Sequence, residues 1–371
     1  MVNSVAIISD VVMKYGGAEK VLDSFLEMYP NSTLFTLFIV PAARKRILKN
    51  FPNVKVKTSL FQIFIWSDYI SRYISVIKIF SWIYWEILDL SKYDLILSLS
   101  HSYMSKNVKK CKKSFHLSYI CTSPRFLYYE YNEIGLIHIF PLNLFFWPIK
   151  KILQFVDKRG SCRPDVLLTD SVNVQKRIKK YYGLDSIVVY PPVDEFLCKK
   201  QNIKDKKDYY VSISRLVKQK GIELAVITCR KMNRKLVVIG GGDEYEFLKK
   251  IGGNTTNFVG RCDDRKKYEL ISGAKALIYT SFDEDFGIVP VESLKAGVPV
   301  IAINSGGVAE VVIDNINGVF FNDRSVDSLS DAINRFEKLN FQKDVCIESV
   351  KKFGKEKFKN EILKIINNEK I

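Results

Sequence analysis

The sequence predicts an α/β protein made of two Rossmann-like domains, each built on a parallel sheet. Near-continuous apolar runs recur along the chain, at 5–10, 93–100, 208–214 and 298–303, and helical segments separate them. Strands that are apolar on both faces are typical of parallel sheets covered by helices on both sides. A chain of 371 residues with 47% hydrophobic residues can bury two such cores.

The first half opens with a predicted strand at 5–10 and, after a glycine pair, a predicted helix from about Ala18 to Met28. A helix is also predicted over 174–183, and Gly183 is expected to end it. Further buried strands are expected at 93–100, 114–120 and 165–171. In a doubly wound sheet, ligands bind beyond the carboxyl ends of the strands, so the residues that follow each strand are candidate site residues.

The second half repeats this alternation after Pro191 and Pro192, where we place the domain boundary. Strands are predicted at 208–214, 235–244, 274–280 and 298–303, with helices at 220–232 and from about Gly287. The expected organisation is an N-terminal domain (1–192), a C-terminal domain (193–351) and a C-terminal helix crossing back to the first domain (352–371).

Charge and cysteine content restrict the class of protein. The net charge of +17 favours anionic partners such as nucleic acid, anionic lipid or phosphorylated substrates. Seven cysteines form no C-x-x-C pair and there are only three histidines, so a zinc site is not expected. The first residues show no secretory signal, and we expect a reducing, cytoplasmic location. The aromatic residues do not alternate with lysines as on a nucleic-acid stacking surface, so nucleic-acid binding is disfavoured.

Two aromatic-rich stretches, 59–90 and 134–153, do not fit the alternation. Asp68 and Arg72 are among the charges that interrupt the first, and Pro141 interrupts the second, so a membrane-spanning helix is disfavoured. One interpretation is a surface that dips into a membrane; the other is a buried helix of the first domain. The net charge slightly favours the membrane.

The stretch SFDEDFGIVPVESLKAG places Glu284 after a predicted strand and Glu292 near the start of a helix. A carboxylate can accept two hydrogen bonds from a ribose diol, and the backbone N–H groups near Phe286 and Gly287 could face an anion. Asp285 or a nearby polar group is expected to cap the helix. The alternative is a pair of surface carboxylates that stabilise the helix N-terminus.

Cations and glycines follow two other strands. Arg215 and Lys220, in SRLVKQKG, can neutralise a diphosphate without a metal ion, although a solvated basic loop would look the same. Gly16 and Gly17, in YGGAEKV, would let the backbone approach a ligand closely.

Together these motifs resemble the family-4 retaining glycosyltransferases of the GT-B fold, over nearly the whole chain. The segments that carry the resemblance are EDFGIVPVE with AGVPVIAINSGGVAEVV, SRLVKQKG, YGGAEKV and PPVD. The resemblance implies two parallel-sheet domains facing a central crevice, and a front-face, retaining transfer. It also implies that the N-terminal domain (1–192) binds the acceptor and the C-terminal domain (193–351) binds the nucleotide-sugar donor. It assigns sugar contacts to Glu284, ribose contacts to Glu292 and the donor diphosphate to Arg215 and Lys220. The other donor-binding candidates are Phe286, Gly287, Ile288, Gly16 and Gly17.

Within that family the chain resembles the bacterial mannosyltransferase-like branch. His101 follows a strand in LSLSHSYM, where that branch often has a histidine, and is the candidate for a catalytic, sugar-contacting histidine. In YICTSPRF, Tyr119, Thr122 and Arg125 fit a second signature and are acceptor-side or sugar-contacting candidates, but Cys121 stands where that signature has histidine. This departure leaves the donor sugar open.

The expected activity is hexosyl transfer, with GDP-mannose as the first choice of donor. The acceptor would be a lipid-linked or polysaccharide surface glycan of the O-antigen or capsule type, at the cytosolic membrane face. A UDP-sugar donor, or a nucleotide-sugar 2-epimerase on the same fold, are the alternatives. No cofactor is expected: the run DED at 283–285 matches a metal-binding Asp-x-Asp pattern, but Arg215 and Lys220 already serve the diphosphate.

Overall fold

The chain folds into two compact units, described in a computed structural model. Unit 1 comprises Met1–Pro192 and Phe358–Ile371, and unit 2 comprises Val193–Lys357. The structure describes residues 4–13, 16–65, 77–128, 142–193 and 208–368. The division after Pro192 follows the double proline, and the second division falls inside the C-terminal helix rather than at residue 352.

Unit 1 holds a parallel sheet, which has seven strands within the described residues, in the order β3-β2-β1-β4-β5-β6-β7. Its strands are β1 (Val5–Ser9), β2 (Thr33–Thr36), β3 (Lys55–Thr58), β4 (Leu95–Ser100), β5 (Phe115–Ile120), β6 (Val166–Thr169) and β7 (Ile187–Val188). Its helices are α1 (Gly17–Met28), α2 (Pro41–Asn50), η1 (Leu60–Phe64), α3 (Ile77–Ile87), η3 (Ser105–Asn107), α4 (Arg125–Tyr128), α5 (Leu142–Ser161), α6 (Val172–Tyr182) and α13 (Lys355–Asn368), most of which belongs to this unit.

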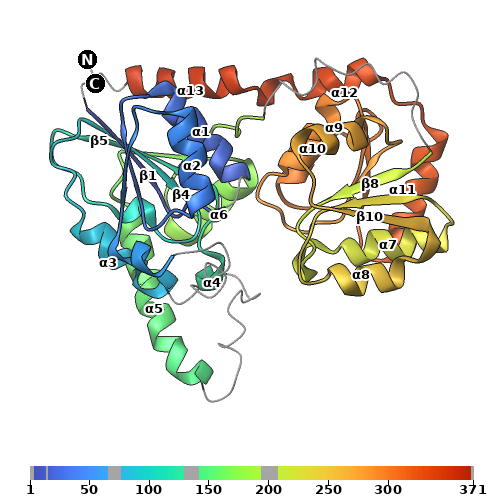
Figure 1. Ribbon diagram of the computed structural model, residues 1–371, viewed down its shortest axis with the longest axis horizontal. Coiled ribbons are helices and arrows are strands. Elements are labelled where there is room, and N and C mark those ends of the chain that lie inside the picture. The colour runs from blue at the N-terminus through green and yellow to red at the C-terminus, as the bar shows by residue number, and fades with distance from the viewer. Residues whose placement is uncertain (1–3, 14–15, 66–76, 129–141, 194–207, 369–371) are drawn as a thin grey trace. The chain divides into compact units, whose positions relative to one another are not determined.

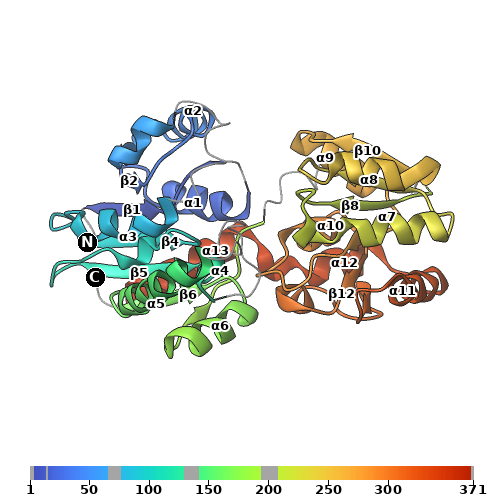
Figure 2. The same cartoon turned by 90° about the horizontal axis from the view of Figure 1, so that it is seen from below.

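Unit 2 holds a second parallel sheet, with six strands in the order β10-β9-β8-β11-β12-β13 over its described part. The strands are β8 (Tyr210–Ile213), β9 (Leu236–Ile239), β10 (Thr256–Gly260), β11 (Leu277–Tyr279), β12 (Val300–Ile303) and β13 (Gly318–Phe321). The helices are η5 (Lys218–Lys220), α7 (Ile222–Lys231), α8 (Tyr245–Gly252), η6 (Gly253–Thr255), α9 (Asp264–Ser272), α10 (Ile288–Lys295), η7 (Gly306–Glu310), α11 (Val326–Lys338), α12 (Lys343–Ser349) and η8 (Lys351–Phe353). Figures 1 and 2 show helices on both faces of the sheet, with α7 and α8 opposite α9, α10 and α12.

Local sequence explains where several helices begin and end. Ser171 caps α6 by accepting a hydrogen bond from the Val174 N–H at 3.1 Å, and Gly183 ends this helix with a left-handed φ of 76°. The expected end at Gly183 is therefore confirmed. The C-terminal helix α13 packs against unit 1, where Phe358 lies 6.0 Å from Phe25 and 5.8 Å from Tyr119, ring centre to ring centre.

The aromatic-rich stretches have both buried and exposed side chains. In α3, Trp85 is fully buried and donates its indole N–H to the Tyr103 carbonyl oxygen at 2.7 Å, whereas Phe80 is exposed. In α5, Leu153 is buried and Trp147 is exposed. Residues 66–76 and 129–141 of these stretches lie outside the described residues. Within the described chain, no helix combines the length and the apolar character needed to cross a membrane.

Candidate functional site

The loop that carries Glu284 is held by a pair of glycines in unit 2. The Gly307 N–H donates to the Glu284 carbonyl oxygen at 2.8 Å, and a Cβ on Gly306 would lie only 2.5 Å from that oxygen. Asp283 adopts a left-handed φ of 53°, and its N–H donates to the Ser305 hydroxyl at 3.1 Å. A non-glycine residue in this conformation is strained, and such strain is often found at functional sites. The SGG segment after β12 therefore fixes the backbone around Glu284.

The Glu284 carboxylate pairs with Lys220, one of the cations expected to hold a diphosphate. The Lys220 ammonium lies 2.5 Å from Glu284 Oε2, and the two side chains are 20% and 21% exposed. Lys220 ends η5, just after β8, and its carbonyl oxygen accepts a hydrogen bond from the Thr280 hydroxyl at 3.0 Å. An ion pair that is still partly hydrated can exchange one partner for an anionic or hydroxyl-bearing ligand.

Glu292 has its own lysine partner, which the sequence motifs did not indicate. The Lys267 ammonium, on α9, lies 3.2 Å from Glu292 Oε2 and 3.0 Å from Asp264 Oδ1. Burial lowers the pKa of Lys267, but the two carboxylates more than offset this, so its pKa is raised above 10.5. Lys267 therefore stays charged and holds Glu292 in place. Because the two residues are 25 positions apart, no short motif could have revealed the contact.

The remaining predicted donor-side residues surround the start of α10. Gly287, with a φ of 98°, precedes the helix, so glycine rather than Asp285 occupies the cap position that we expected to be polar. Phe286 is buried, with its ring 5.2 Å from that of Phe353, and Ile288 is the first helical residue. Arg215 lies exposed just after β8. Unit 2 thus brings Arg215, Lys220, Glu284, Phe286, Gly287, Ile288 and Glu292 to the segments that follow β8 and β11.

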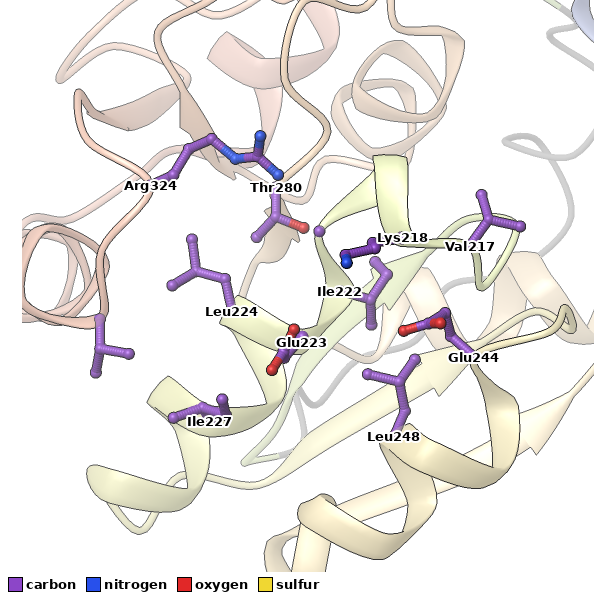
Figure 3. Close-up of a pocket in the computed structure, with 12 residues that line it drawn as sticks. Val217, Lys218, Ile222, Glu223, Leu224, Ile227, Glu244, Leu248, Thr280 and Arg324 are labelled. Atoms are coloured by element: carbon purple, nitrogen blue, oxygen red, sulfur yellow. The ribbon is translucent and has the colours of Figure 1, made fainter. Parts of the chain in front are cut away.

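A cavity of about 260 Å³ borders the Lys220 loop. Figure 3 shows Arg324 and Thr280 on one side and Glu244 and Leu248 on the other. Gly221 forms part of the wall with a φ of 62°, and a Cβ there would lie 3.2 Å from the Thr280 carbonyl oxygen. Glu284 and Glu292 do not line this cavity, so it adjoins the predicted site rather than coinciding with it.

In unit 1, a buried carboxylate shapes the loop that carries His101. Asp10 follows β1 and accepts four backbone hydrogen bonds, from His101, Ser102, Tyr103 and Ser105, at 2.6–2.8 Å. Burial opposes the charge on Asp10, but the charge of His101 and these hydrogen bonds prevail and lower its pKa below 3.8. Asp10 is the last residue of the strand predicted at 5–10, and no sequence motif indicated this role. His101 itself is 20% exposed, with Nδ1 3.7 Å from Asp10 Oδ2.

The glycine pair of unit 1 lies at the beginning of α1. Gly16 is the N-cap residue and Gly17 the first helical residue. Glu19, in the same turn, has a pKa raised above 4.5 because its burial outweighs the charges of His101 and Arg46 and its backbone hydrogen bonds. Glu19 is therefore a second titratable group next to the His101 loop, and the sequence reasoning overlooked it although it belongs to YGGAEKV.

The three acceptor-side candidates occupy different environments. Tyr119 is fully buried in β5, packs on Phe25 and donates its hydroxyl to the Val189 carbonyl oxygen at 2.8 Å. This position gives Tyr119 a role in the core rather than in ligand contact, because the phenol is both covered and hydrogen-bonded. Thr122 is buried just after β5, and Arg125 is the half-buried first residue of α4.

The described residues contain no group of three or more histidine, cysteine, aspartate or glutamate side chains that could hold a metal ion. Asp283 and Asp285, from the DED run, belong to the loop that Ser305 and the glycines fix.

Residues 193–359 match the family model described as Glycosyl transferases group 1. The matched residues span unit 2 and less than half of the chain. The match covers the Lys220–Glu284 and Lys267–Glu292 pairs and ends near the division between the two units.

Two curated relatives are mannosyltransferases that match part of the chain. The alpha-1,3/1,6-mannosyltransferase ALG2 of Kluyveromyces lactis is 29% identical over 204 residues, which is 40% of this chain and 40% of the relative. A GDP-mannose-dependent alpha-(1-6)-phosphatidylinositol monomannoside mannosyltransferase of Mycobacterium tuberculosis is 28% identical over 216 residues, 50% of this chain and 56% of the relative. The matched regions thus span about half of these relatives or less.

A solved structure matches the whole fold. The Anabaena protein Alr3699/HepE, crystallised in complex with UDP, superposes with a TM-score of 0.72 at 16% identity, over 98% of this chain and 100% of that chain. Together with the two parallel sheets, this likeness confirms the predicted GT-B fold. At 16% identity, the likeness to this structure supports the fold but not an activity.

Proposed function

We propose that the protein is a retaining glycosyltransferase that moves a hexose from a nucleotide sugar to a lipid-linked or polysaccharide acceptor. The observation that carries the proposal is the pair of lysine–glutamate contacts, Lys220–Glu284 and Lys267–Glu292, inside the region that matches the group 1 glycosyltransferase model. Carboxylates suit the hydroxyls of a sugar and a ribose, and cations suit a diphosphate.

In this proposal, Arg215 and Lys220 bind the diphosphate, and Glu292 accepts hydrogen bonds from the ribose diol. When Lys220 turns to the phosphates, the Glu284 carboxylate becomes available to the sugar hydroxyls. Gly287 and Ile288 bring backbone N–H groups toward the donor, because a left-handed glycine leaves no side chain in the way. His101 and Arg125, in unit 1, stay the candidates for sugar and acceptor contact, and Asp10 keeps the His101 loop in one conformation.

The transfer step forms a bond between an acceptor oxygen and the anomeric carbon and breaks the bond from that carbon to the phosphate oxygen. The acceptor proton passes to the leaving diphosphate on the same face, so the configuration is retained. Arg215 and Lys220 stabilise the negative charge that develops on the leaving group, and no metal ion is required.

GDP-mannose is the first choice of donor. The M. tuberculosis relative is named for its dependence on GDP-mannose and the K. lactis relative for mannosyl transfer. A UDP-sugar is the alternative donor, since the Anabaena structure contains UDP. The proposed setting is the assembly of a bacterial surface glycan of the lipopolysaccharide or capsule type, by a cytoplasmic protein held peripherally at the inner face of the membrane.

The test is a donor screen with purified protein and a detergent-solubilised membrane lipid extract, with and without EDTA. We expect GDP release from GDP-mannose, unchanged by EDTA and reduced at least about a hundredfold in Glu284→Ala, which removes a group that contacts the reacting sugar. The matched control is Glu246→Ala, which removes an exposed carboxylate of α8 and should keep the wild-type rate.

Other outcomes separate the alternatives. Release of UDP would support the proposed reaction with a UDP-sugar as the donor. A rate that falls with EDTA would indicate a metal ion bound at the DED run. A donor sugar that changes configuration at C2 without any acceptor would favour the 2-epimerase. If no donor is consumed and neither GDP nor UDP binds, the proposal is overturned.

A further inference from the structure

The outer face of α5 in unit 1 combines large apolar and basic side chains. Trp147, Ile152 and Phe155 are 63%, 59% and 66% exposed. Lys151 and Lys158 are exposed on the same face, since positions three, four and seven apart share one side of a helix. The Lys151 ammonium lies 5.8 Å from the centre of the Trp147 ring. Figure 1 shows that the N-terminal half of α5 extends beyond the sheet of unit 1.

The neighbouring helix α3 adds a second apolar stripe. Phe80, Ile83 and Ile87, at helical spacing, are all exposed, and Ile87 is 75% exposed. Glu86 of α3 joins this helix to α5 through an ion pair with Arg159 at 2.6 Å, and it also pairs with Arg163, just beyond the end of α5, at 2.5 Å. We call the exposed side chains of α3 and α5 the α3–α5 surface.

The local charge of the α3–α5 surface is positive. Glu86 is shared by three cations, because Lys109 also lies 3.1 Å from it. One carboxylate cannot neutralise three cations, and Lys151 and Lys158 add to the excess. The surface therefore complements a negatively charged partner, in line with the net charge of +17 for the chain.

The inner face of α5 is fixed to the protein. Asp157 is fully buried and forms an ion pair with the fully buried Lys106 of η3, and Tyr128 donates a hydrogen bond to the same carboxylate at 3.0 Å. The Asn107 amide donates to the Val156 carbonyl oxygen at 3.3 Å. The helix is therefore formed before any partner arrives, and little conformational entropy is lost when its outer face is covered.

We propose that the α3–α5 surface docks unit 1 on an anionic lipid bilayer. A protein interface is the less suitable occupant, because the centres of such interfaces are depleted in lysine. Interfacial helices instead place lysines among Trp, Phe and Ile, so that the ammonium groups reach the headgroups while the apolar groups enter the acyl boundary. The inference extends the proposed function. It rests on that function only to explain why the protein would bind a membrane.

Docking by α5 also has a consequence for the His101 loop. Lys106 and Asn107, which α5 holds, directly follow the loop that Asp10 fixes. The same helix thus contacts the bilayer with one face and the segment next to His101 with the other. His101 would then lie at a set depth relative to the lipid headgroups.

The experiment is co-sedimentation of the full-length protein with vesicles of phosphatidylcholine, alone or mixed with phosphatidylglycerol. We expect binding to the anionic vesicles, weakened about tenfold or more in Ile152→Ser/Phe155→Ser, because each side chain loses most of its apolar contact with the bilayer. Lys151→Glu/Lys158→Glu should weaken it by a similar factor.

Matched controls are available in unit 2. Phe247→Ser/Ile316→Ser removes two exposed apolar side chains, and Lys249→Glu/Lys250→Glu reverses two exposed lysines of α8. Both controls should bind vesicles within about twofold of the wild type, because these side chains lie outside the α3–α5 surface. Lysines away from that surface act on the bilayer only through an electric field that salt screens. Blue-shifted tryptophan emission on vesicles, lost in Trp147→Phe, would place Trp147 in the bilayer.

The proposal is overturned if the α5 variants bind like the controls. It is also overturned if the wild type self-associates without vesicles and Ile152→Ser/Phe155→Ser abolishes this, because the surface would then join two copies of the chain. Circular dichroism of each variant would show that it is folded. Transfer to a solubilised acceptor without vesicle binding would contradict the docking proposal and leave the proposed function in place. Vesicle binding without transfer from any donor would support the docking proposal and contradict the proposed function.

Discussion

The two units use charged side chains in opposite ways. In unit 2, the pairs Lys220–Glu284 and Lys267–Glu292 are partly exposed, so each can exchange a partner for a ligand at small desolvation cost. In unit 1, Asp10 and the Lys106–Asp157 pair are fully covered, and they hold one loop in one conformation. In the proposed function, unit 2 binds with its side-chain charges, whereas unit 1 uses buried charges to position the backbone near His101.

The largest expected effect concerns the buried pair of unit 1. Lys106→Met should lower the free energy of unfolding of unit 1 by about 3–5 kcal/mol, because it leaves Asp157 charged and uncompensated in the interior. Lys106→Met/Asp157→Leu should regain most of that loss, since neither charge then remains buried. Denaturant unfolding followed by tryptophan emission is the measurement, because all four tryptophans lie in unit 1, between residues 66 and 147.

The matching substitution in unit 2 sharpens the comparison. Lys267→Met should lower the unfolding free energy of unit 2 by less than Lys106→Met lowers that of unit 1, because the Lys267 and Glu292 side chains keep 19% and 14% of their surface in water. Equal losses for Lys106→Met and Lys267→Met would contradict the division into positioning charges and binding charges.

A second prediction concerns the acid sensitivity of unit 1. His116 is fully buried, its Nε2 lies 2.8 Å from the Ser98 hydroxyl, and burial lowers its pKa to about 3. Because the unfolded chain has the ordinary histidine pKa of 6.5, it binds a proton that the folded unit does not between pH 6.5 and about 3. The unfolding free energy should therefore be constant above pH 6.5 and fall by about 2 kcal/mol between pH 6.5 and 5.

The same pH series distinguishes His116 from Asp10. The pKa of Asp10 is lowered from 3.8, so its contribution is lost only as the pH falls below 3.8. His116→Asn should flatten the curve between pH 6.5 and 5 and leave the acid limb below pH 3.8 in place. An unchanged slope between pH 6.5 and 5 in this variant would show that another group is responsible.

The sequence predicted the central strands and the motif residues, but not the contacts between them. Central strands such as β1 and β4 are continuous apolar runs, whereas the missed edge strand β3 (Lys55–Thr58) alternates with lysine and is hardly buried. Glu284 and Glu292 were found because they lie in one segment. Tyr119 was misjudged because its motif position says nothing about burial.

The contacts that hold the site come from distant segments. Lys267 reaches Glu292 across 25 positions, and Asp10 reaches the His101 loop across more than 90. Such pairings depend on which strands become neighbours in the sheet, and a single sequence does not contain that information. This is why the sequence indicated the candidate binding residues but not the residues that hold them in place.

The smallest predicted effect tests whether Lys267 positions Glu292. Lys267→Ala should weaken nucleotide binding about fivefold to tenfold in calorimetry, because Glu292 loses the cation that fixes its orientation toward a ribose. Lys266→Ala, next to it on α9 and paired with Glu269, should leave binding unchanged. In a Glu292→Gln background the effect of Lys267→Ala should vanish, because there is no carboxylate left to orient. If Lys267→Ala weakens binding equally in both backgrounds, Lys267 contacts the nucleotide directly. Unit 2 would then bind with Lys267 itself, independently of the Glu292 carboxylate.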